Sequence, residues 1–174
     1  MRRLRLLLCI GNTLRSDDGA AHALGLRMEA RSISDLHVLF EQQLLPEHAA
    51  DAAEADIVVI VDASLTARTV TLEDVDGGSA AVAGEFVSTS TPPTVQQTAR
   101  ALRDMHAMLP RDLADMTALL GGRQPRILLC HIPAERFEHG EELSPATRMH
   151  VAYAEEVLVR FFAAPPPVHR GSAA

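Results

Sequence analysis

Short apolar runs alternate along this sequence with longer segments whose apolar residues recur at helical spacing. The apolar runs cover residues 4–10, 37–40, 57–61, 70–75 and 127–132. Their length and their content of leucine and β-branched residues are typical of buried strands. Helical spacing or helix-start residues cover residues 20–28, 46–54, 95–105, 110–120 and 145–162. Strands separated by helices predict an α/β fold, a three-layer α/β/α sandwich with a mostly parallel, twisted sheet of about five strands.

Turn and cap residues mark several boundaries between these elements. Ser144 before Pro145 is the predicted N-cap of the last helix, and Gly121-Gly122 is expected to end the helix before it. Residues 79–94 are rich in Ser, Thr, Ala and Pro. We expect a loop there, with one edge strand near Phe86.

The length of 174 residues fits one domain. We place this domain at residues 1–163 and expect the proline-rich tail, residues 164–174, to be disordered. A net charge of −7 argues against general nucleic-acid binding, and no apolar segment approaches the ~20 residues of a membrane-spanning helix. The N-terminal apolar run lacks a cleavage site, so we expect a cytoplasmic protein. Cys9 and Cys130 each lie in an apolar run and are predicted to be small core residues.

Carboxylates follow two of the predicted strands. Asp17 and Asp18 stand in the turn after the first strand, and Asp62 ends the third. Ligands of a parallel sheet bind at the carboxyl ends of the strands, where neighbouring loops converge. Two carboxylates in one cleft repel each other unless a cation or a proton lies between them, so the pattern favours a metal site that needs a further ligand. The alternative is that Asp17 and Asp18 cap a helix and Asp62 caps a loop.

A phosphate-binding loop is a poor interpretation of residues 11–19, GNTLRSDDG. This turn has neither the glycine spacing of a dinucleotide fingerprint nor the Gly-Lys-Ser/Thr of a P-loop. Its two acidic residues would also repel phosphate at the start of the helix.

Three segments, taken in order, resemble the hydrogenase maturation endopeptidases. LLLCIGNTLRSDDGAA is similar to the family's first strand, its Gly-Asn-x-Leu turn and its acidic pair. QLLPEHAADAAEADIVVIVDAS resembles the family's Gln-Leu-x-Pro-Glu helix and the strand that ends in Asp-Ala. RILLCHIPAERFEHGEELSPATRMHVAYAEEVL resembles the family's last strand, the turn after it and a Leu-Ser-Pro helix start. Together these segments cover 71 of the 174 residues.

The resemblance implies both a fold and an activity. The family is similar in fold to the α/β/α sandwich, and its members remove a C-terminal extension from the precursor of the large subunit of nickel-iron hydrogenase. They recognise nickel in that precursor through two acidic residues and a histidine. Carried over by resemblance, the acidic ligands fall on Asp18 and Asp62. The resemblance thus implies nickel, supplied by the precursor, or another divalent metal in its place, and the hydrogenase precursor as partner.

The third ligand implied by the resemblance is His106. The family's histidine precedes a leucine-rich helix, a glycine and the last strand, and His106 stands in that pattern. The other placement, near Thr89–Pro93, is disfavoured because no histidine occurs from residue 49 to 105. Choosing His106 requires an insertion in the 77–105 stretch. The alternative for His106 is an exposed histidine on a helix.

Other histidines receive simpler interpretations. His22, one helical turn after Asp18, could share a cation, although packing is the favoured role. His131 and Cys9 stand where the family usually has glycine. We expect three further histidines, His48, His139 and His150, to face solvent.

Asp18, Asp62 and His106 would act as both the metal ligands and the catalytic residues, positioning the scissile peptide beside the nickel, which polarises the carbonyl or the attacking water. Asp17 would orient the turn or hydrogen-bond a ligand. Two alternatives stay open: a metal-dependent hydrolase of a small substrate, and a non-catalytic homologue that binds metal or precursor.

Overall fold

Five strands form one sheet in the computed structural model, which describes residues 4–75, 108–121 and 124–164. The strands are β1 (Arg5–Ile10), β2 (Leu36–Glu41), β3 (Ile57–Ser64), β4 (Thr71–Asp74) and β5 (Arg126–Pro133). Their order across the sheet is β2-β1-β3-β5-β4. All neighbouring pairs are parallel except β4, which runs antiparallel to β5 at one edge. The predicted α/β fold with a mostly parallel sheet of five strands is confirmed.

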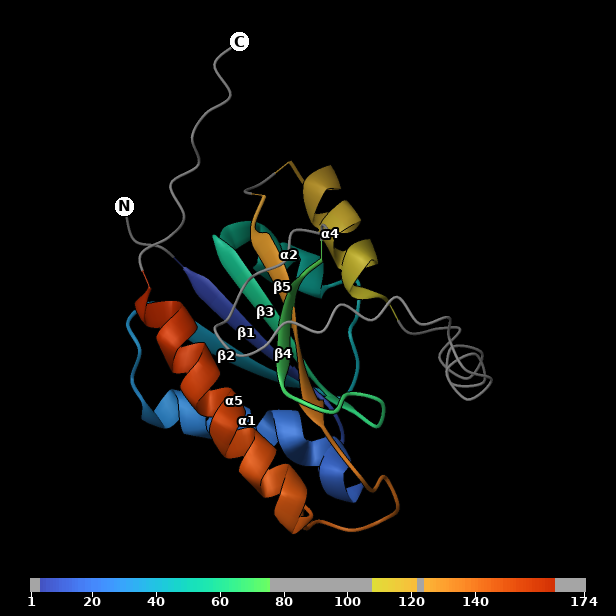
Figure 1. The fold of residues 1–174 in the computed structure, drawn as a ribbon. Coiled ribbons are helices and arrows are strands. Elements are labelled where there is room, and N and C mark those ends of the chain that lie inside the picture. Colours follow the sequence, from blue (N-terminus) through green and yellow to red (C-terminus); the bar gives the residue numbers. More distant parts are fainter. Residues whose placement is uncertain (1–3, 76–107, 122–123, 165–174) are drawn as a thin grey trace.

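Helices cover both faces of this sheet (Figure 1). They are α1 (Ala20–Ala30), preceded by the 3-10 helix η1 (Ser16–Gly19), then α2 (His48–Glu54), α4 (Pro110–Leu119) and α5 (Pro145–Ala163). α1 packs beside α5 on one face, and α2 packs beside α4 on the other. The arrangement is the expected three-layer sandwich. In the described ranges, no helix combines the length and the apolar character needed to cross a membrane.

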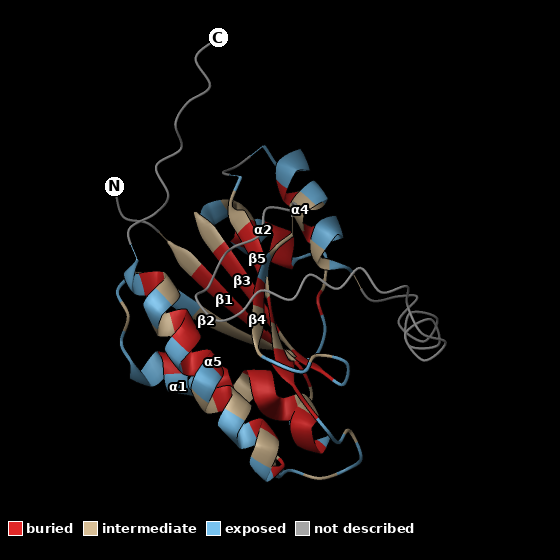
Figure 2. Cartoon of the chain, viewed as in Figure 1, coloured by how far each residue is buried: buried red, intermediate tan, exposed pale blue. Residues whose placement is uncertain are grey.

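The strands divide their buried side chains between two apolar clusters, because successive residues of a strand point to opposite faces. Alternate residues of β3 and β5, such as Val59 and Leu128, join the cluster under α1 and α5. The residues between them, such as Val58 and Ile127, join the cluster under α2 and α4. Figure 2 shows the buried residues concentrated along the central strands and the inner helix faces. The central strands are therefore buried on both faces.

Both cysteines are fully buried and free, as their apolar surroundings predict. Cys9 and Cys130 occupy the α1/α5 face of β1 and β5, and both pair in register with Val61 of the intervening β3. Burial raises the pKa of both thiols, that of Cys130 to about 12. The two thiols are accordingly core groups.

Local signals at two helix ends behave as the sequence predicts. Ser144 is the N-cap of α5, and its Oγ accepts the N–H of Thr147 at 3.2 Å. Pro145 occupies the first turn, where its missing N–H leaves no helical bond unmade. Gly121, just beyond α4, has a φ of +66°, the left-handed conformation that commonly follows a helix.

The structure corrects two boundaries. β3 does not end at Asp62 but continues to Ser64, because Asp62, Ala63 and Ser64 all keep partners in β5. α2 begins at His48 rather than at Pro46, since the two preceding residues form a turn. Several expectations fall outside the described residues: the strand near Phe86, the helix over 95–105, His106, and all but the first residue of the 164–174 tail.

Candidate functional site

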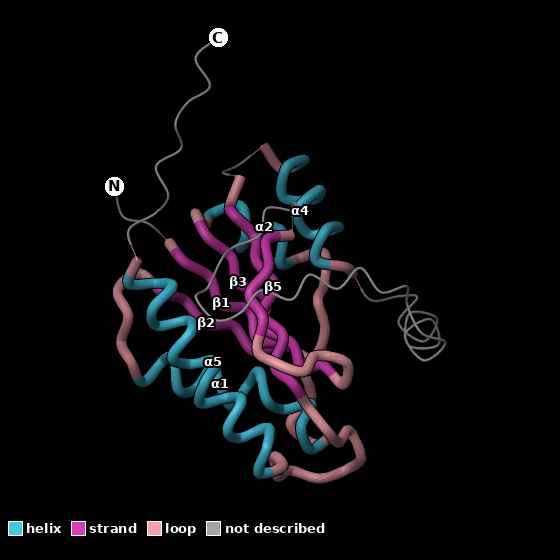
Figure 3. Tube along the Cα trace, in the orientation of Figure 1, coloured by secondary structure: helices cyan, strands magenta, loops and turns pink. Residues whose placement is uncertain are grey.

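The carboxyl ends of β1 and β3 flank the point where the strand order reverses. β1 pairs with β2 at one edge and with β3 at the other. α1, which leads from β1 to β2, covers one face, and α2, which leads from β2 to β3, covers the opposite face. The connections diverge there, and open α/β sheets bind ligands in the crevice outside the strands at such a switch point. Figure 3 shows the loops after β1, β3 and β5 at the same end of the sheet.

Asp18 lies in η1, within the turn that follows β1. Its side chain is 14% exposed, and its Oδ2 lies 3.8 Å from Nη1 of Arg15. η1 contacts β3, so the turn folds back over the end of the sheet. Gly11 permits this path, because its φ is +153° and a Cβ there would overlap the backbone carbonyl oxygen of Asp18. The turn thus holds Asp18, half-buried, at the switch point.

Asp62 is a half-buried residue inside β3, not the residue after its end. Its register partner in β5 is His131, whose Nδ1 is buried. Paired residues of neighbouring strands point to the same face, so Asp62 and His131 both lie on the face that α2 and α4 cover. β3 then ends at Ser64, whose Oγ accepts the N–H of Ala67 at 3.1 Å. The sheet itself, rather than a loop, therefore positions Asp62.

Asp17 has a different environment from its neighbour Asp18. Its side chain is fully buried, and its carboxylate accepts three backbone N–H bonds from the β5–α5 loop. The donors are Glu135 at 3.0 Å, Arg136 at 3.1 Å and Ser144 at 2.6 Å. Burial alone would raise the pKa of Asp17, but the hydrogen bonds from Ser144 and Glu135 outweigh it and hold the pKa below its ordinary value. Asp17 is therefore a buried anion.

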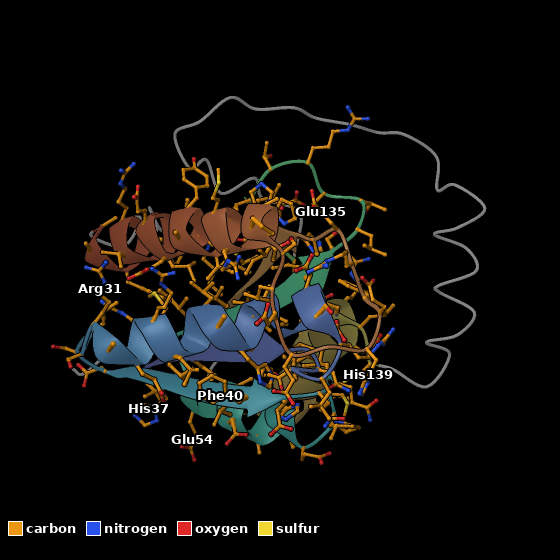
Figure 4. All side chains as sticks on the ribbon, turned by 90° about the horizontal axis from the view of Figure 1, so that it is seen from below. Arg31, His37, Phe40, Glu54, Glu135 and His139 are labelled. Carbon is orange, nitrogen blue, oxygen red and sulfur yellow. The ribbon has the colours of Figure 1, made fainter. Side chains whose placement is uncertain are left out.

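Backbone hydrogen bonds extend this connection between the turn and the loop. The N–H of Ser16 donates to the carbonyl of Gly140 at 2.6 Å, and the N–H of Gly140 donates to Leu14 at 3.0 Å. The N–H of Asp17 donates to the carbonyl of Arg136 at 3.1 Å. Figure 4 shows the β5–α5 loop, with Glu135 and His139 labelled, passing beside the start of α1. The two segments form one hydrogen-bonded unit at the end of the sheet.

The helix-cap alternative for Asp17 and Asp18 is not what the structure shows. No side chain caps η1 or α1, and the N-cap position of α1 is Gly19. Asp62 lies within a paired strand rather than at the first position of a loop. The sequence pattern indicates the carboxylates of the candidate site but not the hydrogen bonds of Asp17. The donors of these bonds are 118 to 127 residues away in the sequence, so no local pattern predicts them.

Three histidines within the described ranges, His22, His48 and His150, have hydrogen bonds that give them a structural role. The ring of His22 bonds the carbonyl of Glu41 at 3.0 Å and packs edge-on against Phe40. His48, expected at the surface, is only 4% exposed, because its Nδ1 accepts the N–H of Leu45 at 2.9 Å and its ring completes the turn into α2. His150 is half-buried and bonds the carbonyl of Pro133, whereas His139 is exposed as expected.

Asp18, Asp62 and His106 are not all within the described part of the chain, because His106 lies outside it. In that part, no three His, Cys, Asp or Glu side chains are grouped to hold a metal ion. The three-ligand set therefore stays a prediction. The described geometry supplies two half-buried carboxylates at the switch point, one on a turn and one on a strand.

This arrangement of sheet and helices is the fold of the hydrogenase maturation peptidases. The chain is similar to hydrogenase maturating endopeptidase HybD from E. coli, with a TM-score of 0.63 and 17% identity over 92% of each chain. It is similar to the hydrogenase 2 maturation peptidase from a Thaumarchaeota archaeon, with a TM-score of 0.60 and 13% identity over 92% of this chain and 99% of that one. A third similar structure is the [NiFe] hydrogenase maturation protease HybD from Thermococcus kodakarensis, with a TM-score of 0.56 and 19% identity over 91% and 98% of the two chains. In sequence comparisons, no family model and no curated protein matches this chain.

Proposed function

We propose that this protein is a hydrogenase maturation endopeptidase, which removes a C-terminal extension from the nickel-loaded precursor of the large subunit of a nickel-iron hydrogenase. The observation that supports it most is the position of Asp18 and Asp62 at the switch point of a fold shared with maturation peptidases. The partner is then a protein precursor in the cytoplasm, and the nickel belongs to the substrate.

In this proposal, Asp18, Asp62 and His106 bind the nickel that the precursor carries. Two carboxylates and one imidazole suit a divalent first-row metal and leave coordination positions open for the substrate. Docking of the nickel places the scissile peptide beside the metal, so much of the rate enhancement comes from positioning. The metal polarises the scissile carbonyl or the attacking water.

Mass spectrometry of a co-expressed large-subunit precursor tests the proposal. With nickel in the medium, the wild-type protein should shorten the precursor by a C-terminal peptide, and without nickel it should not. The variants Asp18→Ala, Asp62→Ala and His106→Ala should each lose at least ~100-fold in processing while staying folded by circular dichroism.

Matched controls come from exposed residues of the same types. Asp115→Ala on α4 and His139→Ala on the β5–α5 loop should process the precursor like wild type. An intact precursor with every preparation would refute the endopeptidase and favour a small-substrate hydrolase or a non-catalytic binder. If His106→Ala alone among the three variants processes the precursor fully, the third nickel ligand is a residue other than His106.

A further inference from the structure

The carboxylate of Asp17 is the centre of a hydrogen-bonded cluster that the nickel-binding proposal does not use. We call this cluster the Asp17 clamp: the Asp17 carboxylate and the backbone N–H groups of Glu135, Arg136 and Ser144. Oδ2 accepts two of these bonds and Oδ1 accepts the third. Hydrogen bonds to an ionised acceptor are about twice as strong as neutral ones, so the clamp is a firm connection.

The clamp joins the η1 turn to the start of α5. Ser144 donates its N–H to Asp17 at 2.6 Å while its Oγ caps α5 by accepting the N–H of Thr147. Glu135 and Arg136 stand just after β5, at the carboxyl end of the sheet. One buried carboxylate thus fixes the turn after β1 against the residues that follow β5 and against the N-cap of α5.

Asp17 and Asp18 are consecutive in η1, so the clamp acts directly on the residue after it. Holding the Asp17 carboxylate and backbone leaves the peptide between the two residues little freedom. The N–H of Asp17 bonds the carbonyl of Arg136, and the N–H of Asp18 bonds that of Arg15, both at 3.1 Å. The carbonyl of Asp17 also accepts the N–H of Ala20, so the peptide between Asp17 and Asp18 is held at both its N–H and its carbonyl. This holds the backbone that carries the Asp18 side chain.

The clamp also separates the roles of the two carboxylates. The three donors of the clamp are backbone N–H groups, and side-chain hydrogen bonds from Ser144 and Thr147 also help to lower the pKa of Asp17. Its charge is therefore satisfied inside the protein. Asp18 has a longer, 3.8 Å contact with Arg15, whose side chain is 53% exposed. The Asp17 carboxylate is buried and stabilises the fold, whereas the Asp18 carboxylate is partly accessible to solvent.

We propose that Asp17 is a positioning residue: through its clamp on the β5–α5 loop, it holds Asp18 in the direction that substrate recognition requires. This inference rests on the proposed function, since it assigns Asp17 to the same site. A misplacement of about 1 Å in a catalytic site can cost ~100-fold in rate, so a loosened clamp has a measurable effect on processing.

The test compares Asp17→Asn with a variant that weakens the fold elsewhere. Asparagine keeps the shape but turns one acceptor into an N–H₂ donor facing backbone N–H groups. Glu155→Gln is the control, because it weakens the buried contact of α5 with Arg27 and Arg31 of α1. Cleavage of purified nickel-loaded precursor is measured at a temperature where each full-length variant is fully folded by circular dichroism.

The expected result is a loss of ~10- to 100-fold in cleavage for Asp17→Asn and wild-type cleavage for Glu155→Gln. The loss should fall in the same parameter, kcat or KM, as that of Asp18→Glu, which keeps the charge and moves it. Wild-type cleavage by folded Asp17→Asn, or an equal loss in Glu155→Gln, would overturn the proposal.

Amide hydrogen exchange gives a readout that does not depend on activity. Asp17→Asn should speed exchange at Asp18 and at the three donor residues, whereas Glu155→Gln should not. If the wild-type protein leaves the precursor intact, the proposed function fails and this measurement decides the inference alone. Unchanged exchange at Asp18 in Asp17→Asn would contradict the positioning role.

Discussion

At positions 17 and 18, two adjacent carboxylates differ in burial and in their partners. Asp17 is fully buried under three backbone donors, and Asp18 keeps a partly exposed side chain. The sequence DDG shows two identical side chains, and the fold gives them different environments. Nearby, Gly11 determines how closely η1 can approach β1, since the chain returns directly against its α-carbon.

We expect Gly11→Ala to destabilise the protein by more than ~2 kcal/mol, because the positive φ of this residue and the overlap with the Asp18 carbonyl both oppose a methyl group. Processing should fall as well, since relief of the overlap moves Asp18. Gly121→Ala is the control: its φ is also positive, at +66°, but nothing lies within 4 Å of the added methyl. It should cost only ~1 kcal/mol in urea unfolding.

Equal costs for the two alanine variants in urea unfolding would show that φ alone matters at Gly11. The close approach of η1 would then have no energetic role. A larger cost at Gly11 with unchanged processing would instead separate stability from the position of Asp18.

At the scale of elements, two ion pairs join α1 to α5, and the arginines that form them are about half exposed. Glu155 of α5 accepts Nε–H bonds from Arg27 at 2.7 Å and from Arg31 at 2.6 Å. Arg31 lies between the two helices in Figure 4. Burial alone would raise the pKa of Glu155, but the bonds from Arg31 and Arg27 outweigh it and lower the pKa.

A lowered folded-state pKa means that Glu155 stabilises the protein above its unfolded pKa and loses this effect as pH falls through the folded value. Glu155→Gln should therefore cost ~1 kcal/mol at pH 7, a modest figure because both arginines are about half exposed. Thermal unfolding of variant and wild type should converge in acid. Glu156→Gln, whose pair with Arg160 is exposed, should match wild type at every pH.

A constant difference between Glu155→Gln and wild type down to acid pH would contradict this assignment. It would indicate that the packing of the Glu155 side chain, rather than its charge, supports the α1–α5 contact.

Most elements of this fold are predictable from sequence because each depends on a local pattern. The apolar runs of β1 and β3 and the Ser144-Pro145 start of α5 are signals within a few residues. The predicted end of β3 at Asp62 is wrong, because a polar residue does not by itself end a strand, and pairing with β5 continues to Ser64. The predicted exposure of His48 is wrong for a different reason: its ring accepts the N–H of Leu45 and is buried in the turn that leads into α2.

The candidate site was predictable only in part. Parallel strands bring their carboxyl ends to one edge, which is why position predicts Asp62 and one of Asp17 and Asp18 as candidates. Only the family resemblance chooses Asp18 over Asp17. The Asp17 clamp could not be predicted, because its donors follow β5 and no local pattern connects them to η1. The antiparallel direction of β4 likewise depends on a connection that the apolar pattern does not specify.

Across the whole molecule, one sheet separates two apolar clusters. Cys9 and Cys130 lie in the cluster under α1 and α5, and Leu113 of α4 lies in the cluster on the opposite face. Every central strand contributes side chains to both clusters. Loss of packing on one face of the sheet therefore also weakens the strands that support the cluster on the other face. We expect the two clusters to unfold together.

Thiol labelling tests this cooperativity. A buried thiol of raised pKa reacts only after the protein opens, so Cys9 and Cys130 should be labelled at the rate set by global unfolding. Leu113→Ala removes a fully buried side chain and should cost at least ~2 kcal/mol, which speeds labelling of both cysteines by about 30-fold. The control is Leu119→Ala on the same helix, 86% exposed, which should label like wild type. Unchanged labelling of both cysteines in Leu113→Ala would mean that the two faces open separately, because the sheet would then fail to transmit the loss of packing from α4 to the strands beneath α1 and α5.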